Sequence, residues 1–95
     1  MKSSEDISKS TKILVKDAAF GSTPISRSQA KRLCDGLEKF EEIILDFSDI
    51  AWMGQGFAHQ IFVVFANANP EIVINPINMN ENVTKMYNHV KLSNV

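Results

Sequence analysis

The chain has 95 residues, of which 44% are hydrophobic, and a formal net charge of −1. This length suits one small domain with its own core. The near-neutral charge argues against a nucleic-acid partner, which a basic patch would attract, and no apolar run reaches the roughly 20 residues of a membrane-spanning helix. We therefore expect a folded module that binds neither nucleic acid nor membrane.

Cysteine usage and the amino-terminal residues indicate a cytoplasmic protein. Cys34 is the single cysteine, which excludes an intrachain disulfide and suits a reducing compartment. The first six residues lack the apolar core of a secretion signal. Residues 1–11 are polar, so we expect a disordered tail there, followed by a domain over residues 12–92.

Strand and helix patterns alternate through the first half of the chain. Branched residues over 12–17 predict a short strand, and the loop after it leads to Ser26. Ser26 and Gln29 have the spacing of a capping box, which predicts a helix that runs past Gly36. The unbroken apolar run 43–47 predicts a central strand buried on both faces, as in a parallel sheet.

The second half repeats this alternation. Residues 55–67 predict a helix, whose apolar stripe is broadened by Val63 and its neighbours beyond what one sheet needs. A strand is expected over 71–75, and then a last helix capped by Asn78 or Asn80. Three strand–helix units predict an α/β layered domain, βαβαβα, with a mostly parallel sheet.

Several residues suggest chemistry, and each also has a simpler structural explanation. Gly54-Gln55-Gly56 precedes a helix, so its amides could hold an anion, but the spacing matches no phosphate-binding motif. The glycines are better explained by a tight turn and close packing. Asp46 and Asp49 could form a carboxylate pair, yet residues three apart on a strand point to opposite faces. Asp46 is better explained as a partner for backbone N–H groups near the end of the sheet, and Asp49 as the cap of a turn.

Histidine and cysteine give no convincing catalytic or metal-binding set. A nucleophilic pair of Cys34 and His59 is one option, but Cys34 lies on an apolar helix stripe and is more simply a core residue. His59 and His89 are too far apart in the chain for a metal-ligand motif. We expect no metal, no cofactor and no enzymatic activity.

Trp52 and Met53 lie in the turn after the central strand. Such side chains are typical anchors of protein interfaces when exposed. The alternative is that Trp52 closes the edge of the core, and the sequence does not decide between the two.

The segment Leu-Asp-Phe-Ser-Asp-Ile-Ala-Trp-Met-Gly-Gln-Gly-Phe, residues 45–57, resembles the central segment of STAS domains, the fold of anti-sigma-factor antagonists. The Gly-Gln-Gly-Phe-Ala turn and residues 76–83 are similar to the bacterial STAS-like family of unknown function. The likeness spans about residues 12–90. It implies a STAS-like fold and a cytoplasmic, regulatory module that docks on another protein, with a kinase-like ATPase as candidate.

The resemblance implies a docking surface at the turn and at the helix that follows. The expected partner-binding residues are Trp52, Met53, Gly54, Gln55, Gly56, His59 and Val63. STAS domains carry a phosphorylatable Ser or Thr in this turn, whereas this chain has none between Gly54 and Gly56, which puts a phosphorylation switch in doubt. Two alternatives stay open: an anion- or nucleotide-binding protein or enzyme that uses the Gly54–Gly56 turn, and a homo-oligomeric structural module.

Overall fold

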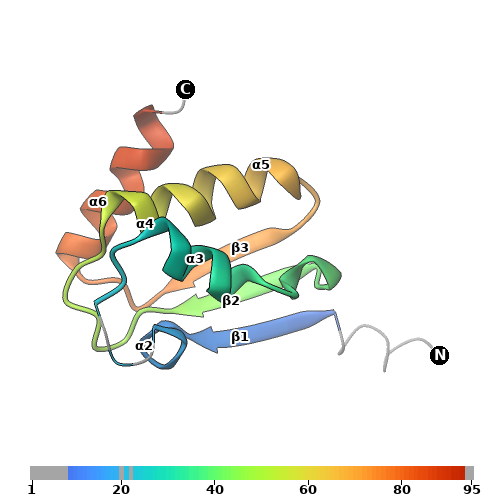
Figure 1. The fold of residues 1–95 in the computed structure, drawn as a ribbon, viewed down its shortest axis with the longest axis horizontal. Helices are drawn as coiled ribbons and strands as arrows, with labels where there is room; N and C mark the ends of the chain where they lie inside the picture. Colours follow the sequence, from blue (N-terminus) through green and yellow to red (C-terminus); the bar gives the residue numbers. More distant parts are fainter. Residues whose placement is uncertain (1–8, 20, 22, 94–95) are drawn as a thin grey trace.

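The computed structural model describes residues 9–19, 21 and 23–93, which form a three-stranded parallel sheet and its helices (Figure 1). A long helix connects β2 to β3 and consists of α4 (Gln55–His59), the π-helical segment η2 (Gln60–Phe65) and α5 (Ala66–Ala68). The other elements are β1 (Ser10–Leu14), α2 (Val15–Ala18), α3 (Arg27–Cys34), the short 3-10 helix η1 (Leu37–Lys39), β2 (Glu42–Asp46), β3 (Val73–Ile77) and α6 (Glu81–Ser93). The predicted α/β class and parallel sheet are confirmed.

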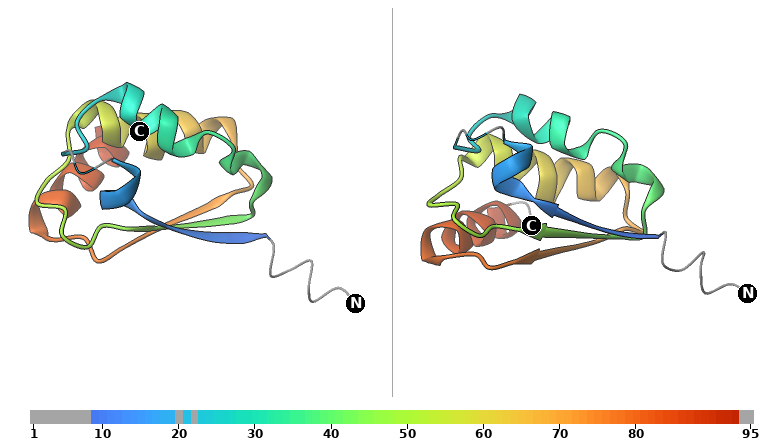
Figure 2. Two further views of the ribbon diagram at one scale, coloured as in Figure 1. Left: turned by 60° about the horizontal axis from the view of Figure 1, so that its bottom comes forward. Right: turned by 90° about the horizontal axis from the view of Figure 1, so that it is seen from below.

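The strand order places both crossover helices on the same side of the sheet. The order is β1-β2-β3, so β2 is central, as predicted. Parallel crossovers are right-handed, and two crossovers that advance in one direction therefore lie on one face. Figure 2 shows α3 and the α4–α5 helix on that face, with α6 near the carboxyl ends of the strands. Within the described residues, no helix covers the opposite face.

The prediction that the central strand is buried on both faces is wrong. Ile43 and Leu45 are buried beneath the helices, whereas Ile44, which alternates with them, is only half-buried. Side chains alternate between the faces of a strand, so Ile44 belongs to the uncovered side. The reason is topological: an apolar run specifies a strand but does not specify how many layers cover it.

Polar side chains on the open face pair with one another across the strands. The Ser10 hydroxyl donates to Glu42 Oε1 at 3.3 Å. Lys12 Nζ lies 3.9 Å from Asp46 Oδ2. These paired polar side chains make the open face compatible with solvent, although half-buried apolar residues also lie on this face.

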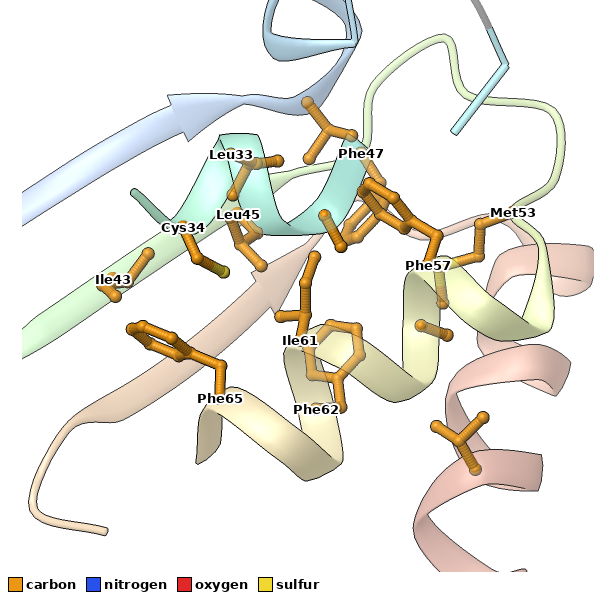
Figure 3. Packing of buried hydrophobic residues seen from close by; sticks show 14 of the residues in the cluster. Leu33, Cys34, Ile43, Leu45, Phe47, Met53, Phe57, Ile61, Phe62 and Phe65 are labelled. Atoms are coloured by element: carbon orange, nitrogen blue, oxygen red, sulfur yellow. The ribbon is translucent and has the colours of Figure 1, made fainter. Parts of the chain in front are cut away.

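The core lies between the sheet and the long helix (Figure 3). Phe57, Ile61 and Phe65 of that helix point towards Leu45 and its neighbours on β2. The ring of Phe62 meets Tyr87 of α6 edge-on, with centroids 4.8 Å apart. The last helix is therefore held to the core by aromatic packing as well as by its buried valines, Val83 and Val90.

The predicted helix starts agree with the structure, with one correction. The Ser26 and Gln29 capping box is present in full, and its helix, α3, begins at Arg27. This helix ends at Cys34, so the expectation that it runs past Gly36 is wrong; Gly36 instead adopts a left-handed φ of 83° that turns the chain towards η1. Of the two candidate caps for α6, Asn80 is the one used, since its Oδ1 accepts from the Val83 N–H at 2.8 Å.

Element boundaries differ from the sequence expectation at both outer strands. Residues 1–8 of the expected tail lie outside the described residues, but β1 begins at Ser10, inside that tail. The chain leaves β1 after Leu14 to form α2, so the strand is shorter than predicted. The strand expected over 71–75 is β3, which begins two residues later and contains Pro76. An edge strand tolerates proline because its outer N–H groups have no partner strand.

No helix in the described part of the chain is long and apolar enough to cross a membrane.

Candidate functional site

The turn between β2 and α4 is held from two directions. The Asn80 side chain donates to the carbonyl oxygens of Ile50 and Ala51 at 3.1 and 3.0 Å. Asp49 adopts a left-handed φ of 64° and pairs with Lys16 Nζ at 3.1 Å. These contacts hold the turn to the start of α6 and to α2. Trp52, which follows Ala51, therefore projects from a fixed backbone.

Trp52 and Met53 point in opposite directions. The Trp52 side chain is 47% exposed, which rules out the alternative that it closes the core. Met53 is 1% exposed and belongs to the core cluster (Figure 3). The expectation that Met53 presents surface to a partner is therefore wrong in this structure. Ile50 and Met53 both turn inward, and Trp52 occupies the outward position between them.

Gly54 allows the loop before α3 to pack closely against the turn. The N–H of Gly54 donates to Pro24 O at 2.9 Å, and the N–H of Phe57 donates to Ile25 O at 3.1 Å. A Cβ on Gly54 would lie 2.5 Å from Ile25 O, so the loop before α3 could not approach. Two amides that an anion would need are thus already used by the chain itself, which favours packing over anion binding at Gly54–Gly56.

The remaining predicted residues lie along the first turns of the long helix. Gln55 is exposed, whereas Gly56 and His59 are half-buried. The Nδ1 atom of His59 is buried without a hydrogen-bond partner. Val63 is 5% exposed, so it does not lie on a free surface as expected; its neighbour Val64 does. Both α3 and α6 pack against η2, so this segment has neighbours beyond the sheet.

The structure does not support a reactive Cys34. The thiol lies in the core cluster under α3 (Figure 3). Burial, followed by the negative charge of Glu38, raises the pKa of Cys34 from 9.0 to about 12. The thiolate that a nucleophile requires is therefore disfavoured. Among the described residues, no group of three or more His, Cys, Asp or Glu side chains is arranged to hold a metal ion.

Asp46 joins the carboxyl ends of β2 and β3. Its Oδ1 accepts from the hydroxyl and the N–H of Ser48 at 2.6 and 3.0 Å, and from Asn78 Nδ2 at 3.0 Å. The Ser48 hydroxyl, the Asn78 amide and the Ser48 N–H lower the pKa of Asp46 from 3.8 to about 2. This confirms the structural explanation of Asp46 given by the sequence: its carboxylate organises the backbone at the end of the sheet.

The lowered pKa of Asp46 predicts a specific loss of stability in acid. Because the unfolded chain binds this proton more readily, the contribution is complete above about pH 4 and is lost as the pH falls towards 2. We expect the urea midpoint of the native protein to fall over this range, and to fall less in Asp46→Asn. Asn78→Gly, which removes one donor but suits the left-handed φ of 57°, should give an intermediate slope. Equal slopes in all three proteins would contradict the assignment.

Trp52 separates two concavities on the surface. One, of about 190 Å³, lies against Lys16 and Asp49. The other is a shallow groove of about 510 Å³ between the turn and α6. The groove is lined by Trp52, Met53, Asn82, Lys85, Met86 and His89. The site is thus an exposed aromatic ring between two hollows at the carboxyl end of the sheet.

Sequence reasoning missed the contribution of α6 to this surface. Lys85, Met86 and His89 line the groove, yet the expected partner-binding residues included none from the last helix. Residues 82, 85, 86 and 89 recur at helical spacing, which was a usable signal, but only the fold shows that they lie beside Trp52.

Comparisons with known proteins agree with this architecture. No curated protein and no solved structure is similar enough to this chain to give a match. A family model described as "STAS-like domain of unknown function (DUF4325)" matches residues 29–84, which run from α3 through the turn and β3 into α6. The match covers more than half of the chain and includes the turn that carries Trp52, but it ends before Lys85, Met86 and His89 of the groove. The chain therefore belongs to the family of STAS-like domains of unknown function.

Proposed function

We propose that this chain is a non-enzymatic regulatory module that binds another protein through the surface around Trp52. The observation that carries the proposal is the exposed Trp52 ring on a turn held by hydrogen bonds. Tryptophan is among the residues that contribute most to binding when a partner covers them. A rigid backbone reduces the entropy lost on binding.

The side chains that would carry chemistry have structural roles instead. Asp46 is surrounded by hydrogen-bond donors, Cys34 is buried with a raised pKa, and the amides of Gly54 and Phe57 bond to the preceding loop. These assignments support a binding role over catalysis. We assign the docking surface to Trp52, Gln55 and the α6 side of the groove, because Met53 and Val63 are buried.

The STAS resemblance favours a cytoplasmic partner of the kinase-like ATPase class. A partner of this kind would recognise the turn without modifying it there, since Gly54, Gln55 and Gly56 carry no hydroxyl. The contact would then depend on shape and apolar area. Control would come from the abundance or conformation of the partner.

Capture of a partner from native lysate tests this function. We expect the Trp52→Ser, Gln55→Lys double variant to lose at least about tenfold in capture, because it removes the central aromatic contact and adds a charge beside it. Val73→Ser is the matched control: Val73 is 59% exposed but lies at the opposite end of the strands. Circular dichroism and the melting temperature should match those of the native chain for both. Undiminished capture by the double variant, or equal losses in both, would contradict the proposal.

A further inference from the structure

We propose that the groove beside Trp52 receives an acidic amphipathic helix from the partner. The site is the docking strip, formed by Trp52, Lys85, Met86, His89 and Leu92. The inference rests on the proposed binding function and adds to it the chemistry of the segment that binds.

The docking strip continues along α6 beyond the groove. Lys85, His89 and Leu92 are spaced four and three residues apart, so they lie on one side of α6. Leu92 is 71% exposed, the largest exposure among the exposed large hydrophobic residues. At 1.5 Å per residue, Lys85 and Leu92 are separated by about 10 Å along the helix axis. Figure 1 shows the carboxyl-terminal turns of α6 projecting past the long helix.

The docking strip has apolar side chains at both ends. Trp52 forms one end, with Met86 half-buried beside it, and Leu92 forms the other. The strip runs along one helix, so the matching arrangement is a second helix whose apolar side chains recur every three to four residues. An extended segment would instead bind along an open strand edge, and a helix such as α6 has no strand edge.

Charge selects an acidic partner helix. The described residues that line the groove include the ammonium of Lys85, and none of them carries a carboxylate. Glu81 pairs with Lys85 at 3.6 Å, but both side chains are largely exposed, so this pair can exchange for a partner carboxylate at small cost.

The other end of the molecule has the opposite charge. A concavity of about 450 Å³ there is lined by Glu41, Glu42, Glu71 and Val73. It presents an exposed apolar side chain among carboxylates, where an acidic helix would be repelled. The chain thus contains its own comparison site, at which a basic helix should be preferred.

Fluorescence gives a direct test, because Trp52 is the single tryptophan of the chain. The probes are designed peptides of about 15 residues, a length at which isolated helices become stable. One carries leucines at helical spacing with glutamates on the other faces. A second has the same leucines with lysines, and a third is the acidic peptide with a central proline. The full chain is titrated with each peptide at low and high salt.

We expect the acidic peptide to shift Trp52 emission to shorter wavelength in a saturable manner, more weakly at high salt. The basic and proline-containing peptides should bind at least about tenfold more weakly. Lys85→Glu should reverse the preference between acidic and basic peptides, and Leu92→Ser should weaken binding of the acidic one. Lys31→Glu is the matched control: it makes the same charge change on the exposed face of α3 and should have no effect.

Other results would overturn the inference. Equal binding of acidic and basic peptides would remove the role of charge, and unimpaired binding of the proline-containing peptide would indicate an extended segment. A concentration-dependent shift without peptide, abolished by Glu71→Lys, would mean that the acidic end of a second copy occupies the docking strip. If no peptide binds while Trp52→Ser, Gln55→Lys still abolishes partner capture, this inference fails and the proposed function stands.

Discussion

Replacing Gly54 with alanine is expected to lower the free energy of unfolding by about 2 to 3 kcal/mol, the upper part of the range for overpacked sites. The added Cβ would lie 2.5 Å from Ile25 O and 2.9 Å from Ile25 Cα. Both are backbone atoms, so no side-chain rotation relieves the contact. The loop must move, and the two hydrogen bonds from Gly54 and Phe57 to Pro24 and Ile25 lengthen with it.

Gly56→Ala is the control, two residues away in the same turn. Its Cβ would meet Arg27 N at 3.5 Å, an ordinary contact. Alanine also favours the helix by about 1 kcal/mol over glycine, so the variant should be neutral or more stable. Urea denaturation of both variants measures the difference. Similar losses at the two positions would show that the glycines are needed for a shared purpose other than the approach of residue 25.

A second large effect is expected from Leu45→Ala, a loss of about 3 kcal/mol in the free energy of unfolding. Leu45 is 1% exposed and lies under the long helix, so its truncation leaves a cavity in the core (Figure 3). Small domains are stable by only about 5 to 15 kcal/mol. A loss of this size should be visible as a clear shift in the denaturation midpoint.

Ile44→Ala on the same strand should cost only about 1 kcal/mol, because Ile44 faces the uncovered side and is already partly in water. The pair of variants therefore measures the asymmetry of the sheet. Equal losses would falsify the one-sided arrangement, since they would mean that something covers the open face in solution. Sedimentation of the native chain would then show whether this cover is a second copy.

Sequence patterns predicted the fold well where the structure depends on residues that are close together in the chain. The Ser26 and Gln29 box specified the start of α3, and the run ending at Phe47 specified the central strand. Both signals depend on neighbours within a few residues. The same reasoning placed Asp46 correctly as a partner for backbone N–H groups.

Errors arose where distant segments decide the outcome. Val63 was expected to be free because the broad apolar stripe exceeds what a sheet can cover, but α3 and α6 also pack against η2, and Val63 is buried. Met53 was grouped with Trp52 because both lie in one loop, whereas the loop backbone turns one inward and the other outward. The groove brings together residues 52 and 85, which are far apart in the chain. Sequence patterns relate only residues a few positions apart, so they do not predict this proximity.

The parallel strand order also has a consequence for folding kinetics. Ser10 and Glu42, which face each other in β1 and β2, are 32 residues apart in the chain, and β2 and β3 are joined over a similar distance. No hairpin is available as a local nucleus for this sheet, so chain entropy must be lost before any strand pair is gained. The helices can form earlier, so the apolar run Ile43 to Phe47 is uncovered until the strands pair and the helices pack on them. An uncovered apolar strand segment of this kind favours aggregation during folding.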